Sequence, residues 1–76
     1  MIVEVLFYNP DVNAYCGKSY TYYCNIQVKE MTKVLAPVQD GDAISLKKAL
    51  VVRTNVSEET LNPEWNIKTI KELDTL

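Results

Sequence analysis

Hydrophobic and polar positions alternate along much of the chain, and β-branched and aromatic residues are frequent at the hydrophobic positions. In residues 2–8, Val3, Val5 and Phe7 fall on one face of an extended chain, because successive side chains of a strand point to opposite sides. The pattern predicts a first strand with this face buried, ended by the Asn-Pro-Asp sequence of residues 9–11.

A second strand is predicted over residues 19–26, where Tyr20 and Tyr22 fall on one face and Tyr23 on the other. The preceding residues 10–18 are mostly polar and end in Gly-Lys. This composition predicts a long connection between the first two strands.

The third and fourth strands are predicted over residues 32–38 and 44–54, on either side of the sequence Asp40-Gly41. Gly41 can adopt a positive φ without a Cβ clash, and Asp-Gly between two apolar runs is a strong hairpin signal. The two strands are therefore expected to form a hairpin.

Three details predict irregular structure next to these strands. Pro37 cannot donate a ladder hydrogen bond, which places the end of the third strand at a sheet edge or a bulge. The alternation breaks at Lys47 and Lys48, which predicts a bend or bulge in the fourth strand. Residues 27–31 form a short polar crossing, with a single helical turn as one interpretation.

The C-terminal third gives mixed signals. Ser57 precedes two glutamates and predicts a capped helical turn over residues 57–61. Residues 65–71 fit both helical and strand spacing, and a fifth strand that closes the sheet is the preferred interpretation. Residues 72–76 are expected to form a loose or helical tail.

Together these elements predict a mainly β protein, a small five-stranded curled sheet or partly open barrel with a short helical turn near residues 57–61. With 76 residues, the chain is expected to be one small β domain spanning residues 1–76. A core of this size stabilises by about 3–5 kcal/mol, so the sequence leaves the oligomeric state open. The residues expected to be largely buried are Val5, Phe7, Tyr22, Val34, Ala49 and Val51.

The charge is small and uneven. The net charge of −2 comes from a slightly basic part, residues 1–57, and an acidic part, residues 58–76. No secretory leader and no apolar run of about 18 residues is apparent, so the chain is expected to be cytoplasmic and without a membrane partner.

The residue types also limit the chemistry. The chain has no histidine and only two cysteines, Cys16 in the predicted connection and Cys24 in the second strand. Both are expected to be free thiols, because a closed zinc site needs four ligands and nothing indicates an oxidising compartment. The two glycines are too few for a phosphate-cradling loop. The sequence predicts a protein that is not an enzyme and uses no metal or cofactor.

Four short segments carry a resemblance to a known family: Lys-Ser-Tyr-Thr-Tyr (18–22), Lys-Val-Leu-Ala-Pro (33–37), Lys-Ala-Leu-Val-Val (48–52) and Ile-Lys-Thr-Ile (67–70). In this order, within residues 2–71, the chain resembles the N-terminal DNA-binding domain of the primosomal replication-restart helicase, which recognises the 3′ end of a nascent strand. It looks even more like stand-alone versions of that domain in phages and mobile elements. The resemblance implies a small module that binds single-stranded DNA or DNA ends.

The match has two departures. Tyr20, Thr21 and Tyr22 stand at the family's aromatic-Asp-Tyr positions, so Thr21 replaces the acidic residue that helps to hold a 3′-terminal nucleotide. Residues 29–31 stand near the family's Val-Gly-Asp and read Lys-Glu-Met. The resemblance therefore implies contacts to nucleic acid from Tyr20, Tyr22 and Lys48, with little advantage from a free 3′ hydroxyl.

Two functions of different classes are predicted as alternatives. The first is binding of single-stranded or forked DNA, because aromatic faces stack on bases and lysines neutralise phosphates. The candidate residues are Lys18, Tyr20, Thr21, Tyr22, Tyr23, Lys33, Lys47 and Lys48, and Arg53 is a further cation that could neutralise phosphate. The structural alternative is that Tyr20 and Tyr22 pack into the core and the lysines form a solvated face, which leaves Tyr23 as the better stacking candidate.

The second function is that of an accessory protein that binds a host or replication factor. Trp65 is the candidate anchor, since tryptophan is enriched at interface hot spots. The structural alternative for Trp65 is packing over the open end of the barrel.

Overall fold

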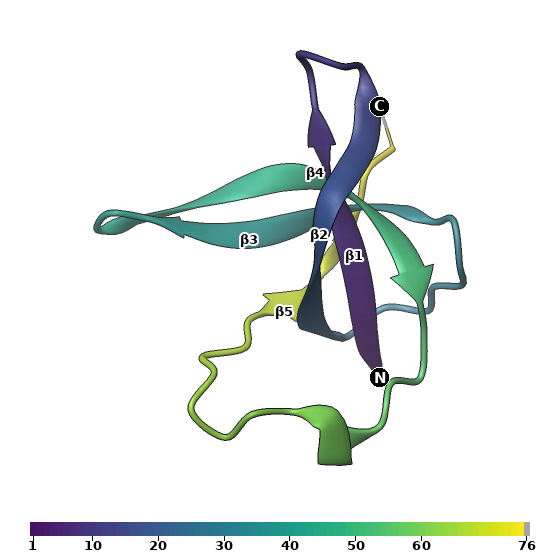
Figure 1. Cartoon of the computed structure of the whole chain (residues 1–76), viewed down its shortest axis with the longest axis vertical. Helices are drawn as coiled ribbons and strands as arrows, with labels where there is room; N and C mark the ends of the chain where they lie inside the picture. The colour runs from purple at the N-terminus through teal and green to yellow at the C-terminus, as the bar shows by residue number, and fades with distance from the viewer. Residues whose placement is uncertain (76) are drawn as a thin grey trace.

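The computed structural model describes residues 1–75, which form one six-stranded sheet and a short 3-10 turn (Figure 1). The order of the strands in the sheet is β5-β2-β1-β4-β3-β6. The elements are β1 (Ile2–Asn9), β2 (Ala14–Cys24), β3 (Lys33–Asp40), β4 (Ala43–Arg53), the 3-10 turn η1 (Glu58–Thr60), β5 (Thr69–Ile70) and β6 (Glu72–Leu73).

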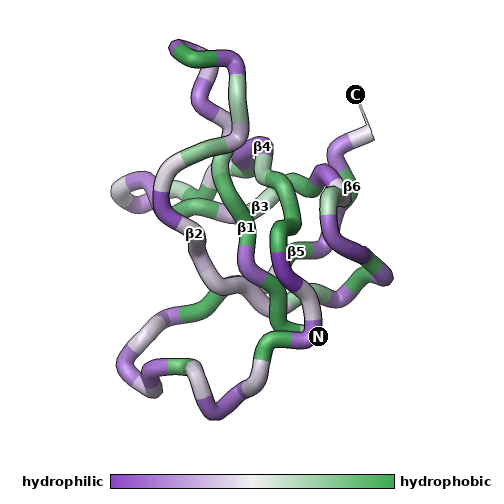
Figure 2. Tube along the Cα trace, turned by 45° about the vertical axis from the view of Figure 1, so that its right-hand side comes forward, coloured by the Kyte–Doolittle hydropathy of each residue, from purple (hydrophilic) through white to green (hydrophobic). Residues whose placement is uncertain are grey.

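Strand β1 lies at the centre of the sheet and pairs antiparallel with both β2 and β4. Val3 and Val5 are fully buried, as the alternation predicted, and Phe7 packs against the same core but stays partly exposed. In Figure 2 hydrophobic segments of β1, β4 and β5 are seen in the middle of the molecule. The core is built mainly from small aliphatic side chains of several strands.

The remaining core expectations also hold. Tyr22, Val34, Ala49 and Val51 are buried, so Phe7 is the one expected core residue that is only partly covered. Cys24 of the second strand is buried as well, and the core further includes four residues that were not singled out from the sequence: Ile2, Val28, Ala36 and Ile70.

The two short C-terminal strands close the sheet. Strand β5 pairs parallel with β2 through Thr69, and β6 pairs antiparallel with β3 through Leu73, with only Lys71 between β5 and β6. Because β2 and β3 lie toward opposite ends of the sheet order, one short segment joins its two sides. The sheet is therefore curled into a nearly closed barrel, which confirms the expected mainly β, partly open barrel class.

The hairpin between β3 and β4 is confirmed. Its last pair is Asp40 with Ala43, and of the two turn residues only Gly41 has a positive φ, 63°. A positive φ at the first turn position is the pattern of a type II′ turn, whose twist matches the flanking strands. This hairpin and the one between β1 and β2 project from the barrel in different directions (Figure 1).

The capped turn after β4 is also confirmed. The Ser57 hydroxyl accepts a hydrogen bond from the Glu59 backbone N–H at 3.3 Å, and the turn η1 follows directly. Ser57 thus satisfies a free N–H at the start of the turn, which is the usual role of an N-cap serine.

Strand β2 begins earlier than expected. The expected long connection over residues 10–18 is wrong, because Ala14 already pairs with Asn9 and Cys16 with Phe7. The register of β1 with β2 shifts between Val5 and Phe7, so three β2 residues face one β1 residue. Gly17, with a φ of 88°, lies in this bulge. The polar composition that suggested a loop belongs instead to an exposed stretch of strand.

Two other expected irregularities are corrected. The pairing of β3 with β4 is continuous through Lys47 and Lys48, so no bulge occurs there. The shift in β4 lies at Val52, where β4 has one more residue than β1. The crossing over residues 27–31 contains no helical turn, and Val28 within it is buried in the core.

The C-terminal segment is likewise more sheet-like at its end than expected. Only Thr69 and Ile70 of residues 65–71 form the closing strand, whereas residues 65–68 lie outside any strand. The expected tail over residues 72–76 is wrong for its first two residues, which form β6, and Leu76 lies outside the described residues.

Candidate nucleic-acid interface

A groove of about 960 Å³ lies at the opening of the barrel, between β2 and β3. It exists because the C-terminal segment closes only part of the gap. Strand β5 pairs with β2 at Tyr23 and Cys24, and β6 pairs with β3 at Val34 and Leu35. Beyond these pairs no strand among residues 1–75 covers the outer edges of β2 and β3, and the groove follows these edges.

One side-chain hydrogen bond spans the gap. The Tyr22 hydroxyl donates to the carbonyl oxygen of Pro37 at 2.8 Å. Burial raises the pKa of the Tyr22 phenol, and the neighbouring Tyr20 adds a smaller effect in the same direction. Pro37 has no N–H, so its carbonyl is the backbone group it can offer to a partner. The expected edge position of Pro37 is confirmed.

The backbone of β2 also presents polar groups to the groove. The Tyr23 N–H donates to the Lys68 carbonyl on the β5 side, whereas the Cys24 N–H donates to the Met1 carbonyl on the β1 side. Backbone groups alternate along a strand, so those of Thr21 point to the same side as those of Tyr23. Thr21 lies beyond the end of β5 and lines the groove.

Two aromatic side chains are well exposed along the groove. Tyr20 is 48% exposed and rests edge-on against Phe7, with ring centroids 5.3 Å apart. Trp65 is 53% exposed and lies in the segment before β5, where its backbone N–H donates to the Asn62 carbonyl. The groove therefore offers aromatic surface from two elements, β2 and the segment that precedes β5.

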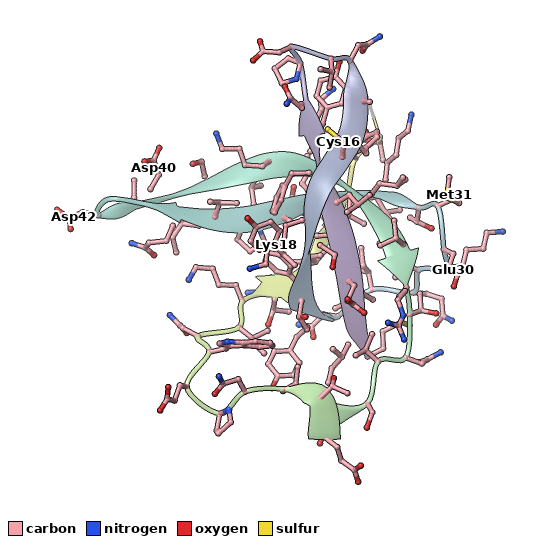
Figure 3. All side chains as sticks on the ribbon, in the orientation of Figure 1. Cys16, Lys18, Glu30, Met31, Asp40 and Asp42 are labelled. Carbon is pink, nitrogen blue, oxygen red and sulfur yellow. The ribbon has the colours of Figure 1, made fainter. Side chains whose placement is uncertain are left out.

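The groove is basic. Among the described residues that line it, none is acidic and four are lysines, namely Lys18, Lys47, Lys48 and Lys68. Figure 3 shows Lys18 on β2 and places Asp40 and Asp42 at the far tip of the β3–β4 hairpin. The local charge thus differs in sign from the net charge of −2 of the whole chain.

The structure brings most of the sequence-derived candidates together and separates two of them. The six that line the groove are Lys18, Tyr20, Thr21, Tyr22, Lys47 and Lys48. Tyr23 points away from this side of β2, and the Lys33 ammonium lies 6.0 Å from the centroid of the Tyr15 ring. Arg53 is also elsewhere, in an ion pair with Glu4 at 3.1 Å.

Sequence reasoning missed Lys68, whereas one of its two interpretations of Trp65, a position over the open end of the barrel, agrees with the place of Trp65 in the groove. Both come from the segment before β5, far along the chain from β2 and β3. Only the parallel pairing of β5 with β2 brings this segment to the groove, and a two-residue strand leaves almost no periodic signal.

The groove presents several kinds of functional group. Its lining contains hydroxyl, ammonium, amide and aromatic groups. In residues 1–75 no group of three or more His, Cys, Asp or Glu side chains is placed to hold a metal ion. Cys16 is exposed and Cys24 is buried, and both are free thiols as expected.

Comparison of the chain with protein-family models, curated proteins and solved structures finds no match. Within the described part of the chain, no helix has the length and apolar character required to span a membrane.

Proposed function

We propose that this chain is a small non-enzymatic module that binds single-stranded nucleic acid, and in particular single-stranded or forked DNA, in the groove between β2 and β3. The observation that carries the proposal is the composition of the groove, which combines exposed aromatic faces with four lysines and no acidic side chain. Proteins that bind single strands use this combination, a positive groove for the backbone and aromatic side chains for the bases.

The exposed rings favour a single strand over a duplex. Tyr20 and Trp65 each keep about half of their surface accessible, enough for an unstacked base to lie against the ring. In a duplex the base faces are already stacked on one another, so these rings would find no partner. Stacking is worth about 1–3 kcal/mol per base and tolerates any sequence, so binding is expected to be sequence-independent.

The lysines would carry the phosphate contacts. Lys47 and Lys48 lie on β4, Lys18 on β2 and Lys68 in the segment before β5, so the cations of the groove come from three separate parts of the chain. The resemblance to the primosomal DNA-binding domain and its phage relatives points to the same ligand. Two free cysteines suit the expected cytoplasmic location, where a single-strand binder meets its ligand.

The test is fluorescence anisotropy of labelled oligothymidine at low salt, followed by a salt titration. If all four lysines contact phosphates, the slope of log Kobs against log salt is about −3, since each contact to a single strand contributes about 0.7. The variant K47A/K48A should lower affinity for all strands and reduce the slope to about −1.4. Forked DNA should bind like the single strand, and a 3′ hydroxyl should match a 3′ phosphate.

A matched control removes the same charge outside the groove. The variant K29A/K33A lowers the net charge as K47A/K48A does, but neither of its residues lines the groove. Its slope should stay near that of the unchanged protein. An absence of any anisotropy change at tens of micromolar protein, or equal effects of both double variants, would contradict the proposal.

A further inference from the structure

The β3–β4 hairpin carries apolar side chains on its outer face as well as on its inner face. Val34 and Ala36 of β3 are buried inside the barrel, so the alternating residues Leu35 and Pro37 point outward. Leu46 pairs with Pro37 and therefore lies on the same outer face. Ile44, two residues before Leu46, also lies on this face because side chains of a strand alternate. We call the four side chains Leu35, Pro37, Ile44 and Leu46 the hairpin face.

The hairpin face is open to solvent. Ile44 is 62% exposed and Leu46 is 50% exposed, whereas Leu35 and Pro37 are partly covered. Beside these four residues lies a hollow of about 430 Å³, whose other wall is the segment from Lys68 to Glu72. A surface apolar cluster with a hollow beside it is the form that a docking site for another molecule takes.

The charged groups around the hollow are mainly basic. Lys68 and Lys71 line it together with Glu72, and Lys48 lies on the outer face of β4, paired with Leu35. The apolar centre is thus bordered by three lysines and one carboxylate. A complementary ligand must supply apolar side chains for the centre and negative charge for the border.

The size of the site decides between a peptide and a second copy of this chain. A stable dimer usually buries about 800 Å² on each partner, contributed by about 20–30 residues. The hairpin face has four apolar side chains and few polar neighbours, which suits a short segment instead. We propose that the hairpin face docks an acidic peptide segment of a partner protein, with two of its apolar side chains placed against Ile44 and Leu46.

This site is distinct from the groove although the two adjoin. Both are lined by Pro37, Leu46 and Lys68, whereas Ile44 and Lys71 line only the hollow at the hairpin face. These two residues therefore report on peptide docking without altering the nucleic-acid groove. Both are exposed, so substituting them leaves the core intact.

The experiment uses a short fluorescein-labelled peptide in which aspartates and glutamates surround one leucine and one isoleucine. Binding should be weakened at least about tenfold by Ile44→Ser, because the variant removes the apolar side chain that the peptide would cover. Lys71→Glu should weaken it about fivefold or more by placing a like charge beside the peptide. Ile44→Ser, which alters no charge, should leave the affinity for oligothymidine unchanged.

Matched controls are available at residues that line neither site. Val12→Ser removes an apolar side chain that is 60% exposed in the β1–β2 turn, and Lys29→Glu reverses a charge outside both sites. Both should leave peptide binding unchanged. Equal weakening by the controls, equal binding of a peptide with lysines in place of its acids, or no binding at millimolar peptide would overturn the proposal. Self-association abolished by Ile44→Ser would overturn it in favour of a second copy.

Discussion

The closed and the open sides of this barrel are built from the same strands but differ in composition. On the closed side, β1 lies between β2 and β4, and the inward residues Val3, Val5 and Val51 are fully buried. On the open side, β2 and β3 have uncovered edges, and the residues there include tyrosines, lysines and a proline. Tyr20 shares its strand face with buried Tyr22 and yet is half exposed.

This difference shows that strand alternation places a side chain on a face but does not decide its burial. Burial depends on whether a neighbouring strand covers that part of the face. Tyr22 directly precedes Tyr23, the first residue of β2 that pairs with β5, and Tyr22 is buried. Tyr20 lies two residues before Tyr22, farther from that pair, and is half exposed. The paired part of the barrel therefore provides stability, and the unpaired part keeps aromatic surface available for a ligand.

The largest expected effect is a loss of folding stability when β5, the strand that closes the barrel, is altered. Ile70 of β5 is fully buried, and Ile70→Ala should cost about 2–5 kcal/mol because it leaves a cavity in the core. This is comparable to the whole stability expected of so small a domain, about 3–5 kcal/mol. Urea unfolding followed by circular dichroism measures the change. Ile44→Ala, at an exposed isoleucine, should change stability by less than about 0.5 kcal/mol. Similar effects of both variants would show that β5 does not secure the barrel.

The second largest expected effect is a loss of affinity for oligothymidine when an aromatic ring of the open side is removed. Tyr20→Ala and Trp65→Ala should each weaken oligothymidine binding by about 1–3 kcal/mol while changing stability little, since both rings are exposed. The matched control is Tyr23→Ala, which removes a tyrosine that is 41% exposed but lies outside the groove. Anisotropy titrations compare the three. A loss of affinity in Tyr23→Ala as large as in Tyr20→Ala would place the stacking surface on the other face of β2.

The smallest expected effect is a loss of stability at Tyr22, which lies between the closed and the open side of the barrel. Tyr22→Phe removes the hydrogen bond to the Pro37 carbonyl and should cost about 0.5–1.5 kcal/mol at neutral pH. Because burial raises the pKa of Tyr22 above its ordinary value of 10.0, the unfolded chain loses this proton at lower pH than the native protein. Stability is then fully present below that value and falls as the pH rises through the raised pKa.

Thermal unfolding at neutral and alkaline pH tests this linkage. The alkaline loss of stability should be smaller in Tyr22→Phe than in the unchanged protein, and Tyr23→Phe should retain it. An identical pH dependence in all three proteins would show that the Tyr22 phenol is not held in its neutral form by the fold.

The sequence determined the features that depend on neighbouring residues. The Asp40-Gly41 turn requires only a residue that accepts positive φ between two strands, and the Ser57 cap requires only a hydroxyl before the first turn. The buried face of β1 follows from alternation over a few residues. These local rules were sufficient for the fold class, for the hairpin and for most of the core.

Only the tertiary structure decided where β2 begins, that β6 exists and what lines the groove. The bulge around Gly17 depends on pairing with β1, and a two-residue strand such as β6 is stabilised by its partner rather than by its own sequence. Trp65 and Lys68 reach the groove because β5 pairs with β2 across most of the chain length. Such contacts join residues that are distant in sequence, and a single sequence carries no local signal for them.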